Sequence, residues 1–131
     1  YVDISDKLLF KSGSFSISDK AKTVLGKVAK VLAAQPNIEF MVEGHTDSKQ
    51  LLDNGSALED NWDLSVKRAT TVVRVLQETY GIDAKRMTAA GRGEYAPIVE
   101  NNSAANRARN RRTRIVILPQ LDQFFKLLEN K

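Results

Sequence analysis

The segment Ile38-Glu-Phe-Met-Val-Glu-Gly-His-Thr-Asp47 decides the fold, because it predicts a strand that leads directly into a polar loop. Ile38 to Val42 is mostly apolar, and we expect it to form a buried strand. Gly44 after it permits a tight turn. Asp47 closes the segment at the carboxyl end of the strand, where sheet proteins often bind ligands. A carboxylate that caps the following loop is the structural alternative for Asp47.

Helices are predicted on both sides of this segment. Before it, apolar residues repeat at helical spacing between the N-cap Ser18 and the helix-breaking Pro36. After a long polar loop, residues 48–60, a second helix is expected from Asn61 to just before the C-cap Gly81. The remaining predicted elements are strands at 4–10, 86–91 and 114–118, a short helix at 103–110 and an amphipathic terminal helix at 121–128. This order predicts an α+β protein in which helices pack on one mixed sheet.

The composition limits the classes of protein and of chemistry. The 131 residues are 42% hydrophobic and 27% charged, which fits one soluble globular domain with one core. No apolar run reaches the roughly 20 residues that cross a bilayer. The net charge of +4 permits an anionic partner, and the absence of cysteine excludes disulfides, thiolate zinc sites and cysteine nucleophiles. The chain opens at Tyr1 without a signal peptide, which we interpret as the edge of an excised domain or a processed end.

Arg68 is a cation whose position requires a partner. It lies four residues after Leu64 and four before Val72, at the edge of the apolar stripe of the second predicted helix. We expect it to pair with an acid or to reach a ligand beyond the start of the helix, because helical side chains tilt toward the N-terminus. Asn61 lies near the same face, and an anionic ligand there would also gain from the helix dipole.

Few residues are available for catalysis or metal binding. His45 is the only histidine, so a serine triad would have to use it as the base. We interpret His45 as a structural residue whose ring nitrogens bond the backbone, and a hydrolase that pairs it with a carboxylate is the alternative. One histidine without cysteine does not support a zinc site. We expect no catalytic residue, no metal and no cofactor.

Five arginines, at positions 107, 109, 111, 112 and 114, form the densest basic run. Nucleic-acid binding is one interpretation of such a run. However, Arg111 and Arg112 would point to opposite faces of a strand, and no aromatic residues interleave with the arginines as a stacking platform requires. We therefore expect no nucleic-acid partner, and we predict that some of these arginines flank the final strand and pair with Asp or Glu.

Three motifs follow one another along the chain. They are Glu43-Gly-His-Thr-Asp47, then Asn61-Trp-Asp-Leu-Ser-Val-Lys-Arg-Ala69, then Gly91-Arg-Gly-Glu94 with Pro97 and Asn106-Arg-Ala-Arg-Asn-Arg-Arg112. A lone motif of this kind proves little, but together they resemble the OmpA-like peptidoglycan-binding family, closest to its MotB-like branch. The resemblance covers roughly residues 5–118 of a single domain that spans 1–131, with 119–131 as a terminal helical extension.

The resemblance implies a βαβαββ fold, an α/β sandwich with two main helices over a four-stranded mixed sheet. It implies non-covalent binding to the peptide stem of peptidoglycan in the periplasm, by a domain that anchors the outer membrane or an envelope complex and does not insert into the membrane itself. In the family pattern Asp47 holds the ammonium of meso-diaminopimelate, Arg68 holds the adjacent carboxylate, and Asn61 lines the pocket. The other motif residues expected to support the site are His45, Thr46, Ser65, Arg111 and Arg112.

These residue types suit diaminopimelate, whose free end carries an ammonium and a carboxylate on one carbon. A carboxylate and a guanidinium a few ångströms apart would bind both charges, and arginine can grip a carboxylate with two parallel hydrogen bonds. A stem that contains lysine instead lacks the second carboxylate, so Arg68 would be left unpaired. We predict that this mismatch is the source of specificity.

Two features depart from the simplest family members. The loop 48–60 is longer, and lying over the pocket, contacting glycan and binding a partner are its three candidate roles. Gly13 stands where some relatives place an asparagine that contacts the ligand, so we expect no side-chain contact there. The terminal helix 121–128 either packs back on the domain or forms a homodimer contact through Phe124 or Phe125. The alternative function is therefore an interaction scaffold of the cell envelope that uses this loop or this helix.

Overall fold

Four strands form one mixed sheet in the computed structural model, which describes residues 1–11, 14–49, 58–119 and 126–129. The strands are β1 (Val2–Ser5), β2 (Phe40–His45), β3 (Met87–Gly91) and β4 (Arg112–Ile117). Their order across the sheet is β1-β4-β2-β3, with β2 and β3 parallel and the other neighbours antiparallel. The predicted fold class, helices on a four-stranded mixed sheet, is confirmed.

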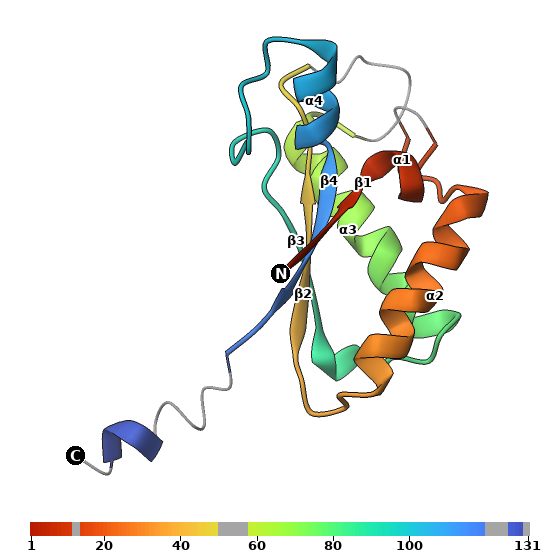
Figure 1. Ribbon diagram of the computed structural model, residues 1–131, viewed down its shortest axis with the longest axis vertical. Coiled ribbons are helices and arrows are strands. Elements are labelled where there is room, and N and C mark those ends of the chain that lie inside the picture. Colours follow the sequence, from red (N-terminus) through yellow and green to blue (C-terminus); the bar gives the residue numbers. More distant parts are fainter. Residues whose placement is uncertain (12–13, 50–57, 120–125, 130–131) are drawn as a thin grey trace.

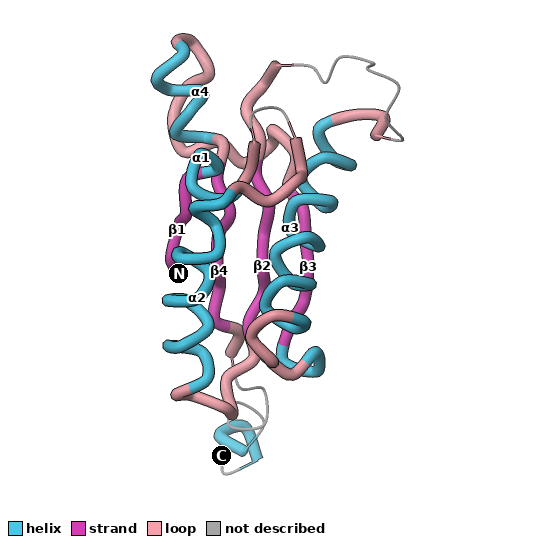
Figure 2. Tube along the Cα trace, turned by 90° about the vertical axis from the view of Figure 1, so that its right-hand side faces the viewer, coloured by secondary structure: helices cyan, strands magenta, loops and turns pink. Residues whose placement is uncertain are grey.

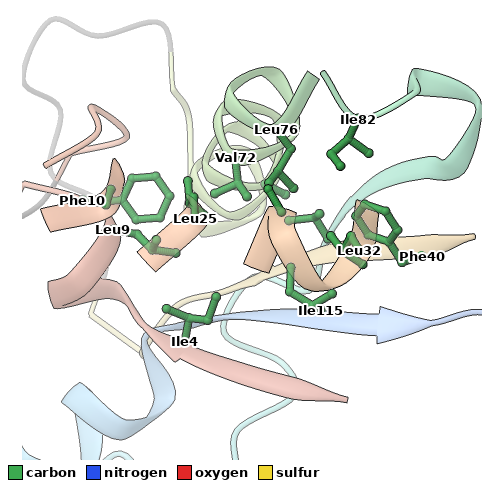
Figure 3. Close-up of a cluster of buried hydrophobic side chains, with 14 residues drawn as sticks. Ile4, Leu9, Phe10, Leu25, Leu32, Phe40, Val72, Leu76, Ile82 and Ile115 are labelled. Carbon is green, nitrogen blue, oxygen red and sulfur yellow. The ribbon is translucent and has the colours of Figure 1, made fainter. Parts of the chain in front are cut away.

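The two long helices, α2 (Asp19–Ala33) and α3 (Asn61–Glu78), cover one face of the sheet (Figure 2). Apolar side chains from both layers meet between them (Figure 3), and burying each of the large ones stabilises the fold by about 1.5–3 kcal/mol. Three short elements complete the fold, namely α1 (Asp6–Leu9), the 3-10 turn η1 (Ala84–Arg86) and α4 (Ala104–Asn110). The largest core side chains include Leu9, Leu25, Phe40, Val42, Val72 and Leu76.

No helix in the described ranges combines the length and the apolar character that a bilayer crossing requires. The terminal helix predicted at 121–128 lies mostly outside the described residues, and so do Phe124, Phe125 and most of the 48–60 loop. Residues 126–129 are helical, and their Leu127 and Leu128 are exposed.

The prediction of one strand over residues 4–10 was wrong. Only the segment up to Ser5 pairs with β4, and the chain then turns into α1 at Asp6. A short apolar run such as Leu8 to Phe10 does not distinguish a strand from a helix by its periodicity. The helical turn buries Leu9 and Phe10 in the core and directs the Asp6 carboxylate toward the end of the sheet.

The tight turn that Gly44 was expected to permit does not form there. β2 continues through Gly44 to His45, and it pairs with β4 there, which begins at Arg112 and not at the predicted position 114. Among the described residues, only Gly81 and Gly93 have a positive φ. Hydrogen bonding between β2 and β4 therefore extends these two strands beyond their apolar segments into polar ones.

Gly44 serves a close approach between β2 and α3. It lies beside Gly91 in the parallel pair β2–β3, and both glycines face Ser65 of α3. A Cβ atom on Gly44 would lie 2.1 Å from the Ser65 carbonyl oxygen, and one on Gly91 would lie 2.4 Å from its Oγ. The two glycines thus let the first turns of α3 rest directly on the sheet.

Gly44→Ala should therefore destabilise the protein by about 3 kcal/mol or more, because the added methyl group meets backbone that has no room to shift. The matched control is Gly26→Ala within α2, where the nearest atom to an added Cβ is the Tyr80 hydroxyl at 3.3 Å. Its cost should stay within about 1 kcal/mol, because alanine favours the helix. Urea unfolding measures both values, and equal costs in the two variants would contradict the close approach.

The face of the sheet that α2 and α3 leave uncovered carries a cluster of charged side chains. Side chains alternate along β2, so Glu43 and His45 point away from the core residue Val42. The His45 Nε2 atom lies 2.5 Å from a Glu43 carboxylate oxygen, and its Nδ1 atom is buried without a hydrogen-bond partner among the described residues. Burial lowers the pKa of His45, the hydrogen bond to Glu43 opposes this effect, and the nearby Arg112 and Arg114 reinforce it.

We expect acid to destabilise the protein through His45. Its folded-state pKa lies below the ordinary value of 6.5, so the unfolded chain binds the proton more readily, and stability falls as the pH drops below about 6.5. His45→Gln should remove this component. The difference in unfolding free energy between wild type and His45→Gln should shrink from pH 7.5 to pH 5. A constant difference across this range would show that His45 does not titrate in this way.

Candidate functional site

The site residues predicted from the sequence gather at one end of the sheet. Asp47 lies two residues after the end of β2, and Arg68 projects from the second turn of α3. The same end receives α1 and the start of β4, as the upper part of Figure 1 shows. Segments that are far apart in the chain are thereby brought next to Asp47.

Four charged side chains form a linked network at this end. The Arg111 guanidinium donates to an Asp47 carboxylate oxygen at 2.6 Å. Its Nε atom lies 3.6 Å from one oxygen of Asp6, and the other oxygen of Asp6 lies 3.3 Å from Arg68. The charges thus alternate in the order Asp47, Arg111, Asp6, Arg68, and we call these four residues the charge network.

Members of the charge network differ in their access to solvent. The side chains of Arg68, Asp47 and Asp6 are 4%, 9% and 11% exposed, whereas that of Arg111 is 31% exposed. Burial lowers the pKa of Arg68, and the charges of Asp6 and Asp47 oppose that effect. A guanidinium nonetheless remains protonated in proteins. Arg68 is therefore a buried fixed charge, and Arg111 is the member most open to solvent.

Arg68 is held in place by more than its ion pair. Its Nε atom donates to the Ser14 carbonyl at 2.9 Å, and its guanidinium lies over the Phe10 ring, 5.1 Å from the centroid. A cation on an aromatic face adds roughly 0.5–1 kcal/mol, and more where it is desolvated. Gly13, where no side-chain contact was expected, falls outside the described residues.

Asn61 and Thr46 fix the backbone that carries Asp47. The Asn61 amide donates to the carbonyls of Asp47 and Lys49, at 3.3 and 2.8 Å, and the Thr46 hydroxyl donates to the Asp47 carbonyl at 2.9 Å. The Lys49 backbone amide donates to the Asp47 carboxylate at 2.9 Å. The Asp47 carboxylate therefore caps the loop, which was its structural alternative, and it is also a member of the charge network.

Ser65, His45 and Arg112 lie outside the charge network. Ser65 is fully buried, accepts from the Gly93 amide at 2.9 Å and donates to the Trp62 carbonyl at 2.9 Å. His45 belongs to the uncovered face of the sheet. Arg112 extends to that face as well and donates to the carbonyls of Asn110 and Ala96, at 3.0 and 3.1 Å. It lines a separate cavity of about 480 Å³ there, together with Asp3, Lys7 and Arg109.

The arginine run is divided between the two faces of the sheet. Arg111 joins Asp47 and Asp6, whereas Arg114 donates to both carboxylate oxygens of Asp3, at 2.8 and 3.1 Å. The prediction that some of these arginines flank the final strand and pair with acids is confirmed for Arg111, Arg112 and Arg114. Within the described part of the chain, no group of three histidine, cysteine or acidic residues is placed to hold a metal ion.

Asp6 is a member of the charge network that was not predicted from the sequence. Asp6 falls within the segment that was predicted as a strand, where it would have pointed to one face like any other strand residue. Its immediate neighbours, Ser5 and Lys7, are polar, so the local sequence does not mark Asp6 as a buried acid. Its pairing with Arg68 depends on the helical turn α1, which the sequence pattern did not predict.

Comparisons with known proteins agree with this fold. A model of the OmpA family matches residues 9–111. Motility protein B of Bacillus subtilis is 34% identical over 91% of this chain, which covers 45% of that protein, so the chain spans about half the length of this relative. The periplasmic domain of Helicobacter pylori MotB superposes with a TM-score of 0.84 at 25% identity, covering 98% of this chain and 90% of that one. The cell wall anchor of the Pseudomonas aeruginosa type VI secretion system has a TM-score of 0.78 at 36% identity, over 90% of this chain and 80% of that one.

The family match extends over most of the chain and includes Asp47, Arg68 and Arg111. The resemblance to its MotB-like members, first indicated by the sequence motifs, is confirmed by both kinds of comparison. The chain therefore belongs to the OmpA family.

Proposed function

We propose that this protein binds peptidoglycan non-covalently, through the diaminopimelate residue of the stem peptide. The observation that supports this proposal most strongly is the charge network, in which two carboxylates and two guanidinium groups alternate at the end of the sheet. A zwitterionic amino acid terminus carries the same two kinds of charge. It can exchange partners with the network without leaving any charge uncompensated.

In the proposed complex, the ligand ammonium binds Asp47 and its carboxylate binds Arg68, with Arg111 as a second contact. Arg111 is the most exposed member of the network, so it is the group that turns from Asp47 toward the incoming carboxylate. Each charge-assisted hydrogen bond contributes roughly 1.5–3 kcal/mol net. Micromolar binding corresponds to a binding free energy of about −8 kcal/mol, so two such contacts reach it only together with added packing contacts. Asn61 supports the site by fixing the backbone at Asp47 and Lys49.

The proposed role is to anchor an envelope structure to the cell wall from the periplasm, without catalysis. Similarity to a motility protein, to a MotB periplasmic domain and to a cell wall anchor supports this role. The placement of His45 also supports it. The ring contacts Glu43 on the uncovered face of the sheet, whereas the charge network lies around α1 and α3 on the other side. A histidine base is therefore not positioned beside Asp47.

Asp47→Asn should weaken binding to diaminopimelate-type peptidoglycan by about tenfold or more, because it removes the charge that holds the ammonium. Co-sedimentation with purified sacculi measures the effect, and circular dichroism checks the fold. Glu78→Gln is the matched control, since it makes the same charge change at an exposed position at the far end of α3. If Asp47→Asn co-sediments with sacculi as well as this control does, the assignment of the ammonium contact to Asp47 is refuted.

The wild-type protein should also bind a diaminopimelate stem peptide at least tenfold more tightly than the matching lysine stem peptide. The lysine peptide brings an ammonium to Asp47 but no second carboxylate to Arg68 and Arg111, so it compensates less of the charge in the network. Isothermal titration with the two peptides gives the ratio of the dissociation constants. Equal affinity for both peptides would mean that the second carboxylate is not recognised.

A further inference from the structure

An exposed pair of stacked aromatic rings lies beside the charge network. Trp62, in the first turn of α3, stacks on Tyr95, with ring centroids 5.0 Å apart and planes inclined by 29°. The two residues are 45% and 62% exposed. Large aromatic surfaces that remain open to solvent in this way often mark binding sites. We call these two residues the aromatic pair.

The backbone of Gly93 packs against both rings of the aromatic pair. Gly93 has a φ of +58°, and a Cβ atom built on it would lie 3.3 Å from the Tyr95 ring and 3.4 Å from the Trp62 ring. Its amide is held by the Ser65 hydroxyl at 2.9 Å, and Tyr95 N donates to the Arg92 carbonyl at 3.2 Å. The rings are therefore presented on a tight turn that is fixed to α3.

Two connections join the aromatic pair to the charge network. Thr46, the neighbour of Asp47, donates its backbone amide to the Gly93 carbonyl at 2.9 Å. Asn61, the neighbour of Trp62, donates to the Asp47 carbonyl at 3.3 Å. In the strand order, Arg111 precedes β4 and Tyr95 follows β3, with β2 between them. The adjoining ends of β4 and β3 are therefore two strand spacings, or about 10 Å, apart.

We propose that the aromatic pair is a subsite for a sugar ring of the peptidoglycan glycan strand, an inference that rests on the proposed function. A pyranose ring is uncharged and has an apolar face of C–H groups, which packs well on an exposed aromatic ring. Along the stem, two residues separate diaminopimelate from the sugar and span about 7 Å when extended. The lactyl linker adds further reach, so one ligand can occupy the charge network and the aromatic pair together.

Three ligands test this subsite: a diaminopimelate stem peptide, the same peptide attached to its disaccharide, and a β-1,4-linked N-acetylglucosamine oligomer. Wild type should bind the disaccharide peptide about tenfold more tightly than the bare peptide. Tyr95→Ala should remove this difference and leave the affinity for the bare peptide within about twofold. Tyr95→Phe, which keeps the ring, should preserve most of the difference. Trp62 is the only tryptophan in the sequence, so its fluorescence should change when the sugar oligomer binds.

The subsite is overturned if the disaccharide adds no affinity in wild type, or if Tyr95→Ala weakens both peptides equally. Equal weakening would mean that the aromatic pair only packs the turn onto α3. Asp47→Asn separates the two proposals, because it should weaken binding of the bare peptide about tenfold or more while the fluorescence response to the sugar oligomer persists. If wild type fails to bind the bare peptide and yet shows that response, the diaminopimelate site is refuted and the sugar subsite stands.

Discussion

The contact between the first turns of α3 and the strands β2 and β3 determines the rest of the structure. Gly44 and Gly91 lie side by side under Ser65, and no side chain larger than hydrogen fits at either glycine without displacing α3. This one close approach places Asn61, Trp62 and Arg68 of the helix beside the carboxyl ends of two parallel strands. The geometry of the proposed ligand site is therefore a consequence of how tightly the helix rests on the sheet.

The charge network satisfies opposing demands. Buried charges are costly, so the folded protein must pair Arg68 and Asp47 even without a ligand, and Asp6 and Arg111 supply those partners. Two of the pairs are loose, at 3.3 and 3.6 Å, and one member is partly exposed. Such a network pairs its charges within the protein, and in the proposed function it exchanges those partners for the ligand's charges. The hydrogen bonds of Asn61 and Thr46 hold the backbone around Asp47.

The sequence predicted the layered fold, the main helices and the members Asp47, Arg68 and Arg111, because these depend on periodic patterns and on motifs. It did not predict the turn into α1, and it consequently missed Asp6, since a short apolar run is ambiguous between helix and strand. The sequence also placed Gly44 in a turn. The reason for a glycine at this position is the contact with α3, which the sequence alone does not reveal. The sequence did not predict that Arg112 points to the uncovered face of the sheet. That direction depends on where β4 begins, and the start of β4 was predicted two residues too late.

The most direct test of the central claim is a crystal structure of the protein with meso-diaminopimelate bound. The ligand ammonium should lie within hydrogen-bond distance of the Asp47 carboxylate, and the ligand carboxylate should lie between Arg68 and Arg111. The 2.6 Å contact between Arg111 and Asp47 should lengthen or break. Ligand density elsewhere on the molecule, with that contact intact, would contradict the account.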